Sequence, residues 1–330
     1  MQDRKKDHIN LAFESLTKGI ENDDRFYYEP LLSAHPTGLK PVDFLGKTLK
    51  APIWISSMTG GTKMAGKINR NLARVASEFG LGMGLGSCRC LIENDDCFDD
   101  FNVRSFIGDK NPLYTNLGIG QIEQLLVSKK TDLVEKMIEK LDADGLIIHV
   151  NPLQEFFQPE GDRFKSAPIN ILEKFLTKTK IKVIIKEVGQ GMGKESLRSI
   201  LKLPIEAIEF GAFGGTNFSN LELMRNDDSF TKELTQFKNV GHMAAEMLEF
   251  LNELIEEHKG VKLKKIIISG GISSFLDGYY LINKSKLPAI YGQGSAFLRY
   301  AMQDYESLQK FVQSQIKGLE MAYSFLKIKH

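Results

Sequence analysis

The stretch Ile147-Ile148-His149-Val150-Asn151-Pro152-Leu153-Gln154-Glu155 passes from an apolar, β-branched run into a cluster of polar residues. Successive side chains of a strand point to opposite faces, so we expect His149 and Asn151 to share one face. Pro152 cannot donate to a β ladder, which places Gln154 and Glu155 on the loop beyond the strand. Because α/β enzymes carry reactive groups at the carboxyl ends of parallel strands, the stretch indicates a functional site. The alternative is a strand that runs into a solvated loop.

Seven other short apolar runs resemble this strand, and most end in glycine or polar residues. They are residues 52–56, 81–87, 112–118, 182–189, 205–210, 265–271 and 288–296. Most are separated by helical patterns, among them residues 122–141, 243–258 and 305–326. Eight alternating strands and helices predict an α/β fold with one (β/α)8 TIM barrel over residues 51–330, preceded by an N-terminal arm and extension over residues 1–50. No G-x-G-x-x-G sequence opens a helix near the N-terminus, which disfavours a Rossmann domain.

Composition narrows the classes of partner. The 330 residues carry a net charge of +1, so no global field favours nucleic acid or an anionic membrane, and no apolar stretch is long enough to cross a bilayer. The sequence shows no secretory signal. It contains three cysteines, Cys88, Cys90 and Cys97, and no fourth zinc ligand lies near them. We therefore expect reduced thiols and a cytoplasmic protein.

Three charged residues stand at or after strand ends, and each has two interpretations. Lys186 emerges from an apolar strand, where it meets either a bound anion or a neighbouring glutamate. Arg89 could bind an anion bidentately or form an ion pair with a carboxylate in residues 93–96. Glu222 and Arg225 lie side by side if their segment is helical, so Glu222 is either a proton-transfer group or half of an ion pair.

Glycine-rich turns follow several of the predicted strands. The strand at residues 81–87 alternates glycine with larger residues, which suits a position where another group packs against its backbone. Gly270-Gly271 and Gly292-Gln293-Gly294 follow the last two strands, where a barrel commonly binds phosphate through backbone N–H groups.

Together these motifs resemble the type 2, flavin-dependent isopentenyl diphosphate isomerases over essentially the full length. The resemblance is carried by residues 4–8, Met58-Thr59-Gly60-Gly61, Gly86-Ser87 with Arg89, Asn116-Leu117-Gly118, His149 to Glu155, residues 159–162, residues 186–189, residues 214–218 and Gly270-Gly271. The run from His149 to Glu155 is highly specific, whereas the glycine turns are shared by many flavin and phosphate barrels.

The resemblance implies an FMN-dependent, Mg²⁺-requiring isomerase whose flavin is reduced by NADPH and which acts on a small-molecule diphosphate. We also expect a homo-oligomer. The cofactor-binding residues it implies are Ser57, Met58, Thr59, Ser87, Asn116, Lys186, Thr216, Gly270, Gly271, Ser295 and Ala296. The substrate-binding residues are Arg4, Lys5, Arg89, His149, Asn151 and Gln154. The metal ligand is Glu155, and the catalytic residues are Gln154, Lys186 and Glu222. The arm that carries Arg4 and Lys5 would cover the substrate.

Some positions depart from the family pattern, and two other functions stay open. Cys88 replaces a common glutamine, Ser273 stands near the position of a usual arginine, and residues 239–243 also differ. The first alternative is an FMN-dependent barrel oxidoreductase of the 2-hydroxy acid oxidase type, which Ser273 disfavours because that chemistry needs a histidine and an arginine late in the barrel. The second is a non-catalytic flavin-binding barrel, which the intact His149 to Glu155 run disfavours.

Overall fold

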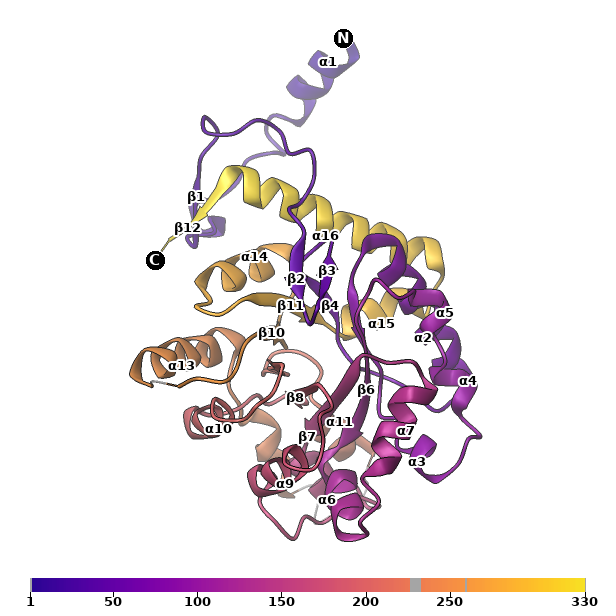
Figure 1. Ribbon diagram of the computed structural model, residues 1–330. Coiled ribbons are helices and arrows are strands. Elements are labelled where there is room, and N and C mark those ends of the chain that lie inside the picture. Colours follow the sequence, from indigo (N-terminus) through magenta and orange to yellow (C-terminus); the bar gives the residue numbers. More distant parts are fainter. Residues whose placement is uncertain (1, 226–232, 259, 330) are drawn as a thin grey trace.

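Eight parallel strands close into a barrel in the computed structural model, which describes residues 2–225, 233–258 and 260–329 (Figure 1). The barrel strands are β4 (Ile53–Ile55), β5 (Gly82–Gly84), β6 (Leu113–Gly118), β7 (Gly145–Val150), β8 (Val183–Glu187), β9 (Ala207–Glu209), β10 (Ile266–Ser269) and β11 (Ala289–Gln293). Their order around the barrel follows the chain, and β11 pairs with β4 to close it. All eight strands and the TIM-barrel class are thus confirmed.

Helices surround the barrel and cover the outer faces of its strands (Figure 1). They are α2 (Lys63–Phe79), α3 (Cys90–Glu93), α4 (Phe98–Phe101), α5 (Arg104–Ile107), α6 (Ile119–Val127), α7 (Asp132–Lys140), α8 (Pro152–Phe157), α9 (Pro168–Leu176), α10 (Lys194–Ile200), α11 (Phe218–Arg225), η2 (Thr235–Asn239), α13 (Ala244–Glu257), α14 (Phe275–Lys284), α15 (Ser295–Ala301) and α16 (Tyr305–Phe325).

Two local predictions were wrong. The single helix expected over residues 122–141 is two helices, α6 and α7, because the chain turns between them through Lys129 at φ +56°. Gln154 and Glu155 lie on helix α8 rather than on a loop. Pro152 is the first residue of that helix, a position where the missing N–H costs nothing and the fixed φ suits the helix.

The barrel interior has an apolar layer below a polar layer. Side chains from the early part of the strands form a separate buried cluster that includes Trp54, Tyr114, Ile147 and Ile184. Two residues further along each strand, the inward-facing positions change character. These positions are Ser56, Asn116, His149, Lys186, Glu209 and Ser269. The switch from apolar to polar residues places the chemistry at the carboxyl ends of the strands.

A hairpin seals the opposite end of the barrel. Strands β2 (Val42–Phe44) and β3 (Lys47–Leu49) pair antiparallel, and Phe44, Leu45 and Leu49 join the apolar interior cluster. Lys47 forms an ion pair of 2.6 Å with Asp144, the residue just before β7, which ties the hairpin to the start of the strands. The extension therefore contributes part of the barrel core.

The glycine-rich strand β5 packs against aromatic and polar neighbours, as its sequence indicates. A Cβ atom on Gly82 would overlap the ring of Trp54, and one on Gly84 would lie 2.5 Å from Ile147 Cδ1 and from Ser57 Oγ. Larger side chains at these two positions would displace the interior cluster.

The N-terminal arm lies apart from the barrel. Helix α1 (Gln2–Leu11) stands off beyond α16 in Figure 1, and the short helix η1 (Gly19–Glu21) follows it. The next segment is anchored: β1 (Phe26–Tyr28) pairs with β12 (Leu326–Ile328), and Arg25 forms a 2.8 Å ion pair with Asp277.

The prediction of reduced thiols was wrong for two cysteines. Cys90 and Cys97 form a disulfide, because the turn between α3 and α4 brings their Cα atoms to 6.5 Å, within the usual range for such a bond. Cys88 is free and buried, and burial raises the pKa of its thiol to about 12. Within the described ranges, no helix has the length and apolar character needed to cross a membrane.

Candidate functional site

Two adjoining cavities open at the carboxyl ends of the barrel strands. The larger measures about 390 Å³ and the smaller about 110 Å³, and they share Ser57, Met58, Lys186, Val188 and Phe218 in their walls. Small-molecule sites commonly measure about 300–1,000 Å³, so the pair is large enough for one cofactor with part of a substrate.

Most of the predicted cofactor-binding residues line these cavities. The larger contains Thr216, Gly270, Gly271, Ser295 and Ala296 besides the shared residues. The smaller contains Ser87 and Asn116, together with His149 and Gln154 from the other predicted sets. Of the predicted cofactor-binding residues, Thr59 alone lines neither cavity. The fold thus brings together residues from all eight strand ends.

Among the described residues, only cations carry formal charge in the wall of the larger cavity. Lys186 and Arg299 are both in it, and no aspartate or glutamate is. Arg299 lies on α15, one turn after Ser295, and its guanidinium makes no hydrogen bond or ion pair within the described ranges. A cavity with two cations and no carboxylate is suited to an anionic ligand.

One turn in the wall of the larger cavity requires glycine because the chain packs closely on itself there. Gly270 follows β10 at φ +87°, a conformation that L side chains rarely adopt, and a Cβ atom there would overlap the backbone of Ala212.

Ser56 and Ser57 have buried hydroxyls without a hydrogen-bond partner among the described residues. Unpaired buried hydroxyls beside a cavity are available to a bound molecule.

His149 is held as a neutral acceptor. Asn116 donates from Nδ2 to the Leu85 carbonyl at 3.0 Å, so its Oδ1 accepts from His149 Nδ1 at 2.8 Å. This assigns the ring proton to Nδ1 and leaves Nε2 as an acceptor. Burial and, secondarily, the charge of Lys186 lower the pKa of His149 from 6.5 to about 3. His149 must therefore take up a proton before it can act as a cation toward a diphosphate.

Asn151 organises the start of helix α8. Its Nδ2 donates to Gln154 Oε1 and to Glu155 Oε1, both at 2.9 Å. Because the oxygen of Gln154 is already bonded, its amide N–H groups are the part free to meet a ligand in the smaller cavity. Glu155 is buried, and its Oε2 accepts from the Asp162 backbone N–H at 2.6 Å.

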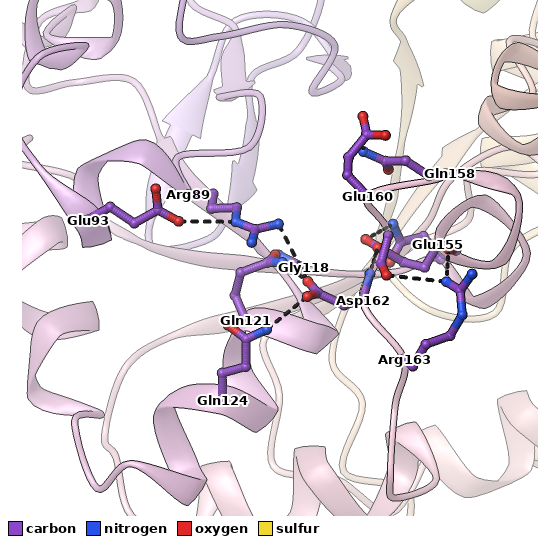
Figure 2. A network of polar contacts seen from close by, with 12 residues as sticks. Arg89, Glu93, Gly118, Gln121, Gln124, Glu155, Gln158, Glu160, Asp162 and Arg163 are labelled. Atoms are coloured by element: carbon purple, nitrogen blue, oxygen red, sulfur yellow. Dashed lines mark hydrogen bonds and ion pairs between the residues drawn. The ribbon is translucent and has the colours of Figure 1, made fainter. Parts of the chain in front are cut away.

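Figure 2 shows a carboxylate, Asp162, between Arg89 and two glutamines. Asp162 accepts hydrogen bonds from Gln121 at 2.5 Å and from Gln124 at 2.8 Å, and it lies 3.6 Å from Arg89. Arg89 also pairs with Glu93 at 3.3 Å, which is the ion-pair alternative foreseen for it. Asp162 thus links Arg89 to the loop after α8, whose backbone donates to Glu155.

The remaining predicted residues lie outside both cavities. Glu222 is buried on α11, which packs against α8, and it accepts a 2.6 Å hydrogen bond from Arg225, as the ion-pair alternative predicts. Arg4 and Lys5 are exposed on α1, and the structure does not bring them to the site. The roles of all the predicted site residues, these three included, stay predictions.

Three site residues were missed at the level of sequence. Asp162 belongs to a motif of the resemblance but was given no role, and neither Arg299 nor Glu209 was predicted to be near the site. Arg299 follows Ser295 by four residues, a spacing that puts both on one face of a helix, so that signal was present. Glu209 follows Ala207 by two residues on a strand, but which face is interior depends on the barrel.

The chain is similar to named proteins across most of its length, although no family model matches it. It is 33% identical over 326 residues to the isopentenyl-diphosphate delta-isomerase of Rickettsia felis, covering 97% of this chain and 91% of the relative. The enzyme of the same name from Chlorobium phaeobacteroides is 34% identical over 281 residues, covering 82% and 76%.

Solved structures share the fold at lower identity. A flavocytochrome b2 variant with benzoylformate aligns with a TM-score of 0.63 and 16% identity, covering 98% of this chain and 85% of that one. A mandelate oxidase variant with (S)-mandelic acid aligns at 0.57 and 14%, covering 93% and 88%. At these identities the likeness concerns the barrel fold alone.

Proposed function

The chain belongs to the isopentenyl-diphosphate delta-isomerase family, and we propose that it interconverts isopentenyl and dimethylallyl diphosphate with reduced FMN and Mg²⁺. The observation that carries the proposal is the pair of adjoining cavities at the strand ends, whose walls, as far as the structure describes the chain, hold cations and no carboxylate. This lining is suited to a phosphorylated cofactor next to a diphosphate substrate.

The residues of the larger cavity fit FMN. Its phosphate would lie against the backbone of Gly270, Gly271 and Ser295, with the Arg299 guanidinium as the cation. Ser57 and Met58 line both cavities, so the flavin ring would lie where the two cavities adjoin. The unpaired hydroxyl of Ser57 supports a polar ligand there.

The isomerisation removes a proton from one carbon and adds a proton to another, so it has no net redox change. When bound, the reduced flavin would supply acid–base chemistry at the alkene. Lys186 lines both cavities and would stabilise negative charge on the ring, a common electrostatic role. Gln154 would orient the alkene through its free N–H groups, because a neutral amide is a poor base.

Glu222 would be a further proton-transfer group. It lies on α11, which contacts the helix α8 that carries Gln154. Its hydrogen bond with Arg225 would have to loosen for that role. In the arrangement described above, Arg225 holds the carboxylate within α11 instead.

The diphosphate would meet Arg89, His149 and Asn151, with Mg²⁺ on Glu155. No group of three metal-ligating side chains was found in the described residues, but Mg²⁺ is commonly held by one or two carboxylates together with substrate phosphates. Each oxygen of Glu155 accepts one hydrogen bond and keeps a lone pair for a cation. Arg4 and Lys5 would close over the substrate if α1 moves toward the strand ends.

One assay separates the isomerase from the oxidoreductase. Isopentenyl diphosphate with FMN, Mg²⁺ and NADPH should yield dimethylallyl diphosphate while NADPH is consumed only in catalytic amounts. Lys186→Ala should lower the rate by about a hundredfold or more. One NADPH oxidised per product, or full activity with oxidised flavin and no reductant, would contradict the proposal. The cytoplasmic location and the homo-oligomer stay predictions.

A further inference from the structure

A buried carboxylate inside the barrel has no hydrogen-bond partner among the described residues. Glu209 ends strand β9 with 0% of its surface exposed, and neither carboxylate oxygen has a hydrogen-bond partner among the described residues. A charged carboxylate in such a place is strongly disfavoured unless a positive charge is near. No residue role described above accounts for Glu209.

Three titratable residues form a row across adjacent strands. His149 on β7 is in register with Lys186 on β8, and Lys186 is in register with Glu209 on β9. All three face the barrel interior, since each follows an apolar interior position by two residues. On its other side, Glu209 is in register with the apolar Ile267 of β10. Of its two register partners, only Lys186 is therefore charged.

The other interior groups do not neutralise Glu209. Ser269 accepts a hydrogen bond from the Gly211 N–H, and Asn116 is engaged with His149 and Leu85. His149 is neutral, because its lowered pKa lies near 3. Lys186 donates its one assigned hydrogen bond to the Glu187 carbonyl at 2.7 Å, so its ammonium keeps two further N–H groups.

We propose that Glu209 is a positioning residue for Lys186: its carboxylate balances the buried ammonium and limits how strongly the site attracts negative charge. This rests in part on the proposed function, because Lys186 would contact the flavin. Glu209 lines neither cavity, so it acts through Lys186 and not by touching a ligand.

The first test needs no flavin. Urea unfolding of the full chain is compared for wild type, Lys186→Met, Glu209→Gln and the double variant. Lys186→Met alone should lower the urea midpoint, because it leaves Glu209 buried without a counter-charge, and adding Glu209→Gln should recover most of the loss. Additive changes would overturn the pairing. Failure of Glu209→Gln to fold even beside Lys186→Met would also overturn it.

The second test measures how tightly FMN binds in its oxidised and reduced forms. Reduced flavin in a cationic site carries extra negative charge, which Glu209 opposes. Unit charges about 10 Å apart at an effective dielectric constant of about 20 change an equilibrium about tenfold. Glu209→Gln should therefore favour the reduced form about tenfold, seen as a higher midpoint potential.

Two control variants make the result specific. Glu209→Asp keeps the charge and should leave the potential close to that of wild type. Glu206→Gln removes a carboxylate three residues earlier that is paired with Lys264 at the surface, and it should shift nothing. An unchanged potential in Glu209→Gln would overturn the electrostatic role. If FMN does not bind at all, the proposed function fails while the unfolding cycle still decides the pairing.

Discussion

Arg299 offers the sharpest test of how the larger cavity recognises its ligand. Replacing it by alanine removes one of the two cations in the wall and breaks no hydrogen bond or ion pair to any residue in the described ranges. Alanine is also the better helix former, so α15 should not be weakened. Any effect on binding should therefore come from the lost contact with the ligand.

The size of the effect follows from the type of contact. A hydrogen bond to a charged group contributes about 1.5–3 kcal/mol, which corresponds to a change of about 10- to 150-fold in affinity. Riboflavin has the same ring and ribityl chain as FMN but no phosphate. Arg299→Ala should thus weaken FMN binding by about 10- to 150-fold and change riboflavin binding less than about twofold.

Quenching of flavin fluorescence on titration with protein measures both affinities. Arg299→Lys should retain part of the FMN affinity, because lysine keeps the charge but not the guanidinium fork. Arg70→Ala, on helix α2 and outside both cavities, is the matched control and should change neither affinity. Equal weakening of FMN and riboflavin, or no weakening of either, would refute the role of Arg299 at the phosphate.

Three further predictions follow from the site. Glu155→Gln should lose activity and Mg²⁺ dependence together while flavin stays bound, since Glu155 lies outside both cavities; unchanged turnover with the same Mg²⁺ requirement would remove its metal role. Deletion of residues 1–6 should raise KM strongly and leave FMN affinity and folding intact, because α1 is exposed; an unchanged KM would return the arm to a solvated end. Between pH 6.5 and about 3 the unfolded chain binds a proton at His149 that the folded chain does not. The free energy of unfolding should therefore decrease as the pH is lowered through this range. His149→Gln should flatten this slope in urea titrations, and parallel slopes would contradict the lowered pKa.

Periodicity predicted the barrel well because each strand ends in a local signal. The alternation before His149 and the apolar residues before Lys186 correctly indicate two strands, and these strands turn both side chains toward the barrel interior. The glycine pattern of residues 81–87 correctly indicates tight packing against a neighbour, which proved to be Trp54. These features depend on residues near each other in sequence.

Features that depend on distant residues were not predictable in the same way. The bond between Gln121 and Asp162 joins residues 41 apart, and only the folded barrel brings them together. The register of Lys186 with Glu209 also required the closed sheet. The disulfide of Cys90 with Cys97 depends on how the short helices α3 and α4 turn, which composition does not specify.

The β2–β3 hairpin affects the order in which the chain can fold during synthesis. Phe44, Leu45 and Leu49 leave the ribosome before any barrel strand, yet the cluster that buries them includes Ile267 and Ile290 from β10 and β11. These three side chains must therefore stay partly exposed until almost the whole barrel has been translated. Contacts between distant residues form slowly, and exposed apolar surface on a nascent chain promotes aggregation. We expect the hairpin to be a binding site for chaperones on the ribosome, and its docking to be the step that completes the native barrel.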